Sequence, residues 1–109
     1  MDGEVPALSV GEFAALRAGE GPYALLDVRE PWEVALGALP EASTIPMSAL
    51  HDQLDALPAD RPLVVLCHHG QRSAQVTAWL HRRGYDNAVN LDGGIDAWSR
   101  TVDPAMPTY

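Results

Sequence analysis

The single cysteine of the chain, Cys67, stands between a continuous apolar run and a polar segment that holds a glycine, an arginine and a serine. The apolar run at residues 63–66 is typical of a strand covered on both faces, and from Ser73 the pattern takes the period of a helix. The short loop between this strand and this helix can point several backbone N–H groups at its centre, where the positive end of the helix also favours an anion. A thiol held there is favoured as the nucleophilic thiolate. We therefore predict that Cys67 is a nucleophile in an anion-binding loop.

The polar residues that follow Cys67 have separate expected roles. Gly70 lets the backbone curl without a Cβ clash, and Arg72 can close the ring of donors or pair with a carboxylate behind it. A buried structural cysteine is the alternative, but it would not need a polar, glycine-containing loop behind it. We expect this loop to bind the substrate through His68, His69, Gly70, Gln71, Arg72 and Ser73.

Three stretches of the chain together resemble rhodanese (thiosulfate sulfurtransferase) domains. Residues 67–73 resemble the active-site loop of pattern Cys-x-x-Gly-x-Arg-Ser, residues 26–33 resemble the first signature, and residues 90–98 resemble the last. They occur in the family's order and spacing, and the similarity runs from about Val5 to the end of the chain. The resemblance implies an open, mostly parallel five-stranded α/β sheet with helices on both faces.

The elements that must position the loop can be read along the chain. Strand and helix patterns alternate, which favours a mostly parallel sheet covered on both sides. Ser9 and Glu12 have the spacing of a helix capping box, and Pro31 suits the first turn of a second helix. We predict one domain over residues 1–109, with residues 102–109 as an extended tail packed on it. Strands are predicted at residues 5–8, 23–28, 43–45, 63–66 and 87–91, and an amphipathic helix at residues 46–57.

Two charged residues follow the second predicted strand, at the end of the sheet that also carries Cys67. Asp27 is expected to accept hydrogen bonds from loop amides or from Arg72. Arg29 is expected to pair with Glu33 across one helical turn or to support the loop from behind. A local cap and a surface ion pair are the alternatives for these two residues.

Two further features concern the surroundings of the loop: a glycine near it, and a segment that departs from the family pattern. Gly93 opens the last helix and is expected to line the pocket, although paired glycines can also serve only close packing of strand and helix. In the segment at residues 37–42, Ala38 and Glu41 replace a histidine and a glycine of the family pattern. We interpret both positions as turn structure.

The spacing between Cys67 and Arg72 separates two kinds of cysteine chemistry. Tyrosine phosphatases and the arsenate-reductase and cell-cycle relatives of rhodanese use Cys-x5-Arg, whose wider ring holds a tetrahedral oxyanion, whereas this chain has Cys-x4-Arg. The resemblance implies a sulfur atom held on Cys67 as a persulfide. The expected enzyme moves sulfur from a small anionic donor such as thiosulfate to cyanide or a thiol, with no cofactor and with ping-pong kinetics.

Other functions remain open at this point. A persulfide carrier that receives sulfur from a protein donor, or an interaction module in a sulfur relay, would carry the same loop, and a cysteine-dependent phosphatase or arsenate reductase is a further alternative. We expect no metal site, because Cys67, His68 and His69 are adjacent and cannot all turn to one ion. His51 is expected at the surface, and His68 and His69 are expected to tune substrate choice.

Composition limits the partners. The net charge of −8 argues against nucleic acid. Residues 61–85 nevertheless hold four of the seven arginines and none of the 15 acidic residues, which suits a small anionic substrate. No apolar stretch is long enough for a membrane span, and residues 1–4 lack the apolar core of a secretory signal. With one cysteine and no internal disulfide, we expect a cytoplasmic protein.

Overall fold

The computed structural model describes residues 5–109, so the expectation about a secretory signal at residues 1–4 lies outside the described residues. Five strands form one sheet in the order β1-β5-β4-β2-β3, and all four strand pairs are parallel. The predicted parallel α/β sheet is confirmed, with shorter edge strands than expected. The strands are β1 Ala7–Leu8, β2 Ala24–Asp27, β3 Ser43–Thr44, β4 Leu63–Leu66 and β5 Ala88–Leu91.

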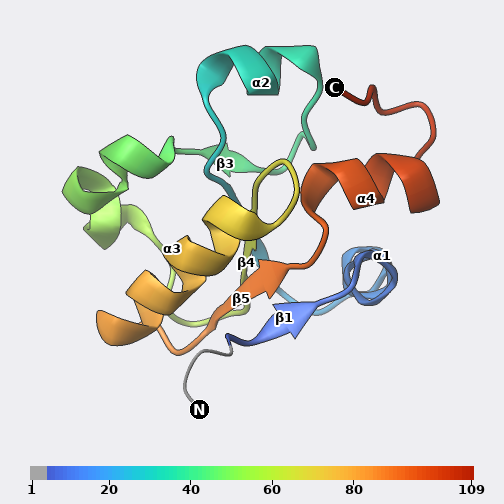
Figure 1. Cartoon of the computed structure of the whole chain (residues 1–109). Helices are drawn as coiled ribbons and strands as arrows, with labels where there is room; N and C mark the ends of the chain where they lie inside the picture. Colours follow the sequence, from blue (N-terminus) through green and yellow to red (C-terminus); the bar gives the residue numbers. More distant parts are fainter. Residues whose placement is uncertain (1–4) are drawn as a thin grey trace.

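Helices cover both faces of the sheet (Figure 1). They are α1 Val10–Ala18, α2 Pro31–Leu36, the 3₁₀ helix η1 Met47–Ala56, α3 Gln71–Arg82 and α4 Gly94–Thr101. Successive side chains of a strand point to opposite faces, and β4 follows this rule. Leu63 and Val65 join a core with α3 and η1, whereas Val64 and Leu66 join a core with α1 and α4. Burial on both faces explains why β4 is apolar throughout.

Local sequence signals account for where two helices begin. The Ser9 side chain accepts a hydrogen bond from the Glu12 N–H at 3.0 Å, and Glu12 Oε1 accepts one from the Ser9 N–H at 2.8 Å, which is the predicted capping box. Pro31 occupies the first turn of α2, as expected.

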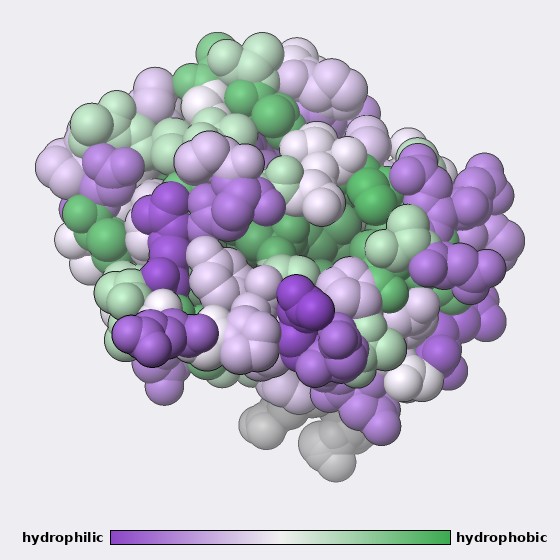
Figure 2. Space-filling view, turned by 180° about the vertical axis from the view of Figure 1, so that it is seen from behind, coloured by the Kyte–Doolittle hydropathy of each residue, from purple (hydrophilic) through white to green (hydrophobic). Residues whose placement is uncertain are grey.

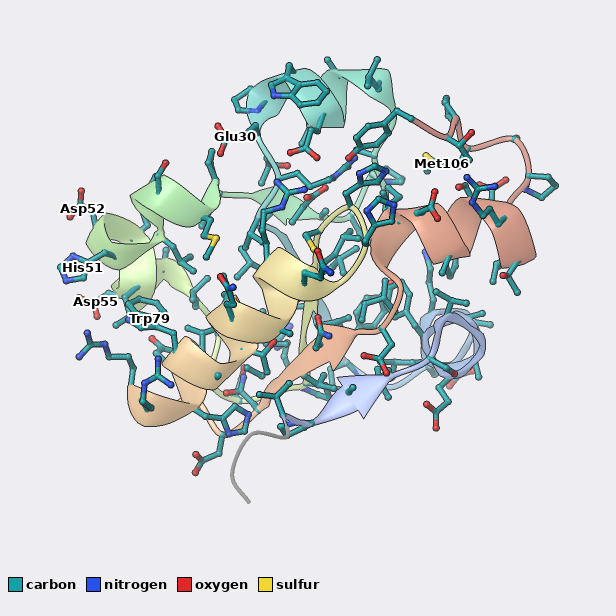
Figure 3. All side chains as sticks on the ribbon, in the orientation of Figure 1. Glu30, His51, Asp52, Asp55, Trp79 and Met106 are labelled. Carbon is teal, nitrogen blue, oxygen red and sulfur yellow. The ribbon has the colours of Figure 1, made fainter. Side chains whose placement is uncertain are left out.

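The predicted amphipathic helix at residues 46–57 forms as the 3₁₀ helix η1, interrupted at Gln53 (φ −120°, ψ 18°). Leu50 and Leu57 are buried, as the pattern predicts. Each half of η1 repeats its apolar residues at a spacing of three, which is the period of a 3₁₀ turn. The His51 side chain is 79% exposed and projects from η1 into solvent, so its predicted surface position is confirmed (Figure 3).

The reverse face of the molecule carries hydrophilic side chains around a hydrophobic area (Figure 2). None of the helices within residues 5–109 has the length and apolar character to cross a membrane. The loops after β2, β4 and β5 leave the same end of the parallel sheet, where ligands bind in open α/β folds.

Candidate active site

Cys67 follows β4 directly and is only 1% exposed. Its Sγ accepts hydrogen bonds from the backbone N–H groups of Gly70 at 3.1 Å and Ser73 at 3.4 Å, and it lies 3.3 Å from Ser73 Oγ. These donors belong to the loop and to the first turn of α3, where N–H groups have no partner within the helix. Two backbone N–H groups and the Ser73 hydroxyl therefore face the sulfur, in line with the expectation that N–H groups of this loop point at its centre.

Ser73 is tied to β5 through Asn90, a contact that sequence reasoning missed. The Ser73 hydroxyl donates to Asn90 Oδ1 in a short hydrogen bond, and the same proton can instead serve Cys67 Sγ. Asn90 Nδ2 donates to the carbonyl of Gly70 at 3.3 Å and to Asp92 Oδ1 at 3.2 Å. The sequence signal for this contact is Asn90 itself, a polar residue at a buried position of an interior strand, because buried polar groups need hydrogen-bond partners.

The start of α4 is bound to the backbone of the Cys67 loop. The N–H groups of Ile95 and Asp96 donate to the carbonyls of Cys67 and His68 at 2.9 and 3.0 Å. A Cβ on Gly94 (φ +61°) would lie 2.5 Å from both carbonyl oxygens. Gly94 is therefore the glycine that faces the loop carbonyls. Gly93, which is predicted to line the pocket, lies close to Gly70: its backbone N would be 2.9 Å from a Cβ built on Gly70.

We expect Gly94→Ala to destabilise the fold by about 2–5 kcal/mol. The left-handed conformation costs about 1–2 kcal/mol for a residue with a Cβ, and overpacking typically adds about 1–3 kcal/mol. Gly84→Ala is the matched control, because Gly84 also has a positive φ (+93°) but no atom lies within 4 Å of its built Cβ. Urea unfolding measures both variants. Equal losses would show that the contact with the loop carbonyls has no energetic weight.

Arg72 binds a carboxylate of α2. Its two terminal nitrogens donate to the Glu33 carboxylate at 2.7 and 2.8 Å. The Glu33 side chain is only 4% exposed and also accepts a hydrogen bond from the Tyr109 hydroxyl at 2.8 Å. The Arg72 hydrogen bonds lower the pKa of Glu33 from 4.5 to about 2, against an opposing effect of burial. The carboxylate behind Arg72 is Glu33, so its expected pairing with Asp27 is wrong.

Asp27 and Arg29 form a separate ion pair beneath the site. The Arg29 guanidinium donates to Asp27 at 2.7–3.2 Å, and both side chains are completely buried. Arg29 also donates to the backbone carbonyls of Glu33 and Gly37 and to the Tyr109 hydroxyl. The expected pairing of Arg29 with the Glu33 carboxylate is wrong, because Arg72 occupies it. Arg29 instead links the end of β2 to a carbonyl within α2 and to the carbonyl of Gly37, which follows α2.

Aromatic rings stack over the loop. Tyr109, from the predicted tail, stacks on His68 with ring centroids 3.8 Å apart and planes 7° apart. The centroid of the His69 ring also lies 3.8 Å from that of His68. Burial lowers the pKa of His68 from its ordinary 6.5, and neighbouring His69 lowers it further. A lowered pKa disfavours the charged form of the His68 imidazole. Gln71 is exposed.

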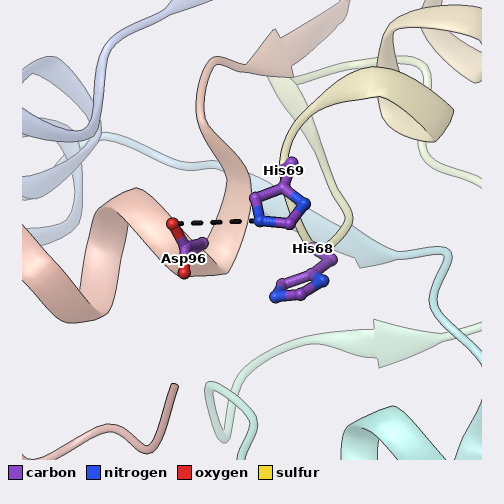
Figure 4. Close-up of side chains that lie close together, drawn as sticks. All are labelled: His68, His69 and Asp96. Carbon is purple, nitrogen blue, oxygen red and sulfur yellow. Dashed lines mark ion pairs between the residues drawn. The ribbon is translucent and has the colours of Figure 1, made fainter. Parts of the chain in front are cut away.

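A carboxylate joins the two histidines in space, a contact that the linear pattern did not show. One ligand atom from each of His68, His69 and Asp96 lies within 4.8 Å of the others. His69 Nε2 is 4.0 Å from Asp96 Oδ2 (Figure 4). Asp96 lies in the first turn of α4, 27 positions after His69 in the chain.

The basic segment predicted from the sequence is largely compensated in the fold. Arg72 is paired with Glu33 and Arg61 with Asp60, both acids from outside residues 61–85. Arg82 and Arg83 lie at the end of α3 opposite to the Cys67 loop. Clustering of arginines in sequence therefore does not produce a matching cluster of free cations at Cys67.

We expect the free energy of unfolding of Glu33→Gln to fall less steeply between neutral and acidic pH than that of the wild type. A carboxyl whose pKa is lowered in the folded state stabilises the fold at pH values above its ordinary pKa of 4.5. That contribution disappears as the pH falls through the folded-state pKa of about 2. The contribution at neutral pH is on the order of 3 kcal/mol. Free energies of unfolding between pH 7 and pH 2 measure it. A variant whose acid limb keeps the wild-type slope would contradict the assignment.

Glu41→Gln is the matched control for this prediction. Arg17 likewise lowers the pKa of Glu41 to about 2, and Tyr23 also donates to Glu41. Glu41 is 30% exposed, so solvent screens its pair and the acid effect is expected to be smaller. Glu41→Gln should leave the Cys67 loop unchanged. The turn predicted at Glu41 therefore also contacts α1, through the ion pair between Glu41 and Arg17.

Comparison with known proteins agrees with this geometry. The model of the rhodanese-like domain family matches residues 9–101. A sulfurtransferase of Allochromatium vinosum is 42% identical over 76 residues, which cover 70% of this chain and 71% of that protein. The crystal structure of SSP1007 from Staphylococcus saprophyticus has a TM-score of 0.82 at 34% identity and covers 89% of this chain and 96% of its own. The human single-domain sulfurtransferase TSTD1 has a TM-score of 0.78 at 32% identity and covers 90% and 98%. The chain belongs to the family of rhodanese-like domains.

Proposed function

We propose that this protein is a sulfurtransferase that carries sulfur as a persulfide on Cys67, with thiosulfate or a similar anion as donor. The observation that carries the proposal is the position of Cys67 Sγ among the N–H groups of Gly70 and Ser73. Those donors stabilise negative charge on sulfur without a metal or an organic cofactor. A free thiol nucleophile also suits the reducing cytoplasm.

Two displacements at sulfur complete the proposed cycle. The Cys67 thiolate attacks the outer sulfur of thiosulfate, the S–S bond of the donor breaks, and its electron pair leaves with sulfite. The new bond leaves Cys67 as a persulfide, whose terminal sulfur bears the negative charge. Cyanide or a thiolate then attacks that terminal sulfur, and the electron pair of the Cys67 S–S bond returns to Cys67. The products are sulfite and thiocyanate, or a persulfide of the accepting thiol.

Two features favour sulfur transfer over phosphate chemistry. Only four residues separate Cys67 from Arg72, so the loop is shorter than the family's oxyanion-binding form. Arg72 is also engaged in a bidentate pair with Glu33, which leaves it poorly placed to hold a tetrahedral dianion over the sulfur.

Intact mass after incubation with thiosulfate tests the proposal. We expect the wild type to gain one sulfur atom, the gain to disappear on addition of cyanide, and Cys67→Ala to gain none. A wild-type chain without the adduct in the absence of reducing agents would overturn thiosulfate as donor. An adduct formed only with a protein persulfide donor would identify a relay carrier. Release of phosphate from an aryl phosphate would identify a phosphatase.

A further inference from the structure

We propose that His68, His69 and Asp96 bind one divalent cation of the zinc class at the edge of the Cys67 loop. His69 turns one ring nitrogen toward the Asp96 carboxylate, and the His68 ring lies beside this pair (Figure 4). One ligand atom from each residue lies within 4.8 Å of the other two. This binding goes beyond sulfur transfer and does not require it.

One nitrogen of His68 and one oxygen of Asp96 lack a hydrogen-bond partner among the described residues. These atoms, His68 Nε2 and Asp96 Oδ1, are both buried. Buried polar side-chain atoms nearly always have one, so this pair calls for a ligand. A cation between them would satisfy an imidazole lone pair and a carboxylate oxygen together.

The fold holds the three ligands on connected elements. Asp96 donates its backbone N–H to the carbonyl of His68 at 3.0 Å, which fixes the start of α4 against the loop. Arg100 donates to Asp96 Oδ2 at 3.0 Å and orients the carboxylate while Oδ1 stays available. The Tyr109 ring stacks on His68 and limits its rotation. Such supporting contacts are the kind that orient metal ligands in known sites.

The ligand set selects the class of ion. Two imidazoles and one carboxylate suit Zn²⁺, Co²⁺, Ni²⁺ or Cu²⁺, whereas Mg²⁺ and Ca²⁺ prefer oxygen ligands alone. Tetrahedral zinc, with bonds of about 2.0–2.1 Å, places its ligand atoms roughly 3.3 Å apart. His69 Nε2 lies 4.0 Å from the other oxygen of this carboxylate, Oδ2, and the His69 side chain is 58% exposed, so rotation of this side chain can bring its nitrogen to a cation held by Oδ1.

The test measures binding of Zn²⁺ to the full chain carrying Cys67→Ser, which removes the thiol as a competing ligand. Calorimetry is expected to give one ion per chain, with no heat from Mg²⁺. His69→Asn and Asp96→Asn should each weaken binding by about tenfold or more. His51→Asn is the matched control, because His51 also lies beside a carboxylate, Asp52 at 3.5 Å. This variant should bind as tightly as its parent.

A second measurement separates binding from damage to the fold. Imidazole ¹⁵N signals of His68 and His69 are expected to shift with one equivalent of Zn²⁺, while those of His51 stay unchanged. The exposed position of His69 lets His69→Asn fold normally, which a thermal melt verifies. Absence of stoichiometric binding, equal affinity in His69→Asn and Asp96→Asn, or loss of binding in His51→Asn would each overturn the proposal. None of these outcomes depends on whether Cys67 accepts sulfur.

Discussion

Cys67→Ser is expected to lower the rate of thiocyanate formation from thiosulfate and cyanide on the order of 10³-fold or more. A serine hydroxyl is a far weaker nucleophile toward sulfur than a thiolate, and it cannot form a persulfide. Steady-state rates at several concentrations of both substrates measure the effect. The wild type should give the parallel double-reciprocal lines of ping-pong kinetics. Intersecting lines would contradict a free persulfide intermediate.

Ser73→Ala refines this prediction, because it removes one donor from the sulfur and leaves the nucleophile in place. Ser73 Oγ lies 3.3 Å from Cys67 Sγ, and the amides of Gly70 and Ser73 remain. We expect kcat/KM to fall about 10- to 100-fold, less than the loss of a main oxyanion-hole donor. Ser99→Ala is the control, since Ser99 is also buried but donates to the carbonyl of Asp96. Equal activity in both variants would remove Ser73 from the mechanism.

Arg29→Met is expected to reduce the free energy of unfolding by about 3–5 kcal/mol. The substitution leaves the Asp27 carboxylate buried without its partner, which is the costly way to break a buried ion pair. It also removes donors from the carbonyls of Glu33 and Gly37. Urea unfolding followed by circular dichroism gives the value, with an unchanged m-value as evidence of a two-state transition.

Two variants make this stability prediction specific to the buried pair. Arg61→Met removes an exposed arginine that is paired with Asp60, and it should leave the unfolding midpoint nearly unchanged. Asp27→Asn combined with Arg29→Met should recover part of the loss, because the uncompensated charge is gone. A double variant less stable than Arg29→Met would show that hydrogen bonds, and not the charge, set the cost.

Much of the fold can be predicted because its signals are local. The all-apolar stretch Leu63–Leu66 predicts a strand buried on both faces, and the capping box at Ser9 marks the start of α1. The loop after β4 follows from residues within one turn of each other. A tight turn into the helix brings the N–H groups of Gly70 and Ser73 onto Cys67 Sγ.

The sequence by itself determined the parallel sheet and the position of the loop after β4, since backbone conformation and hydrophobic period depend on neighbouring residues. Only the tertiary structure decided the partners of the charged and aromatic side chains. Pairing of Arg72 with Glu33 depends on where α2 lies relative to α3. The sequence alone does not distinguish the Asp27 carboxylate from the Glu33 carboxylate as the partner of Arg72. Docking of Tyr109 on His68, and of Asp96 beside His69, depends on contacts between elements far apart in the chain, which no local pattern encodes.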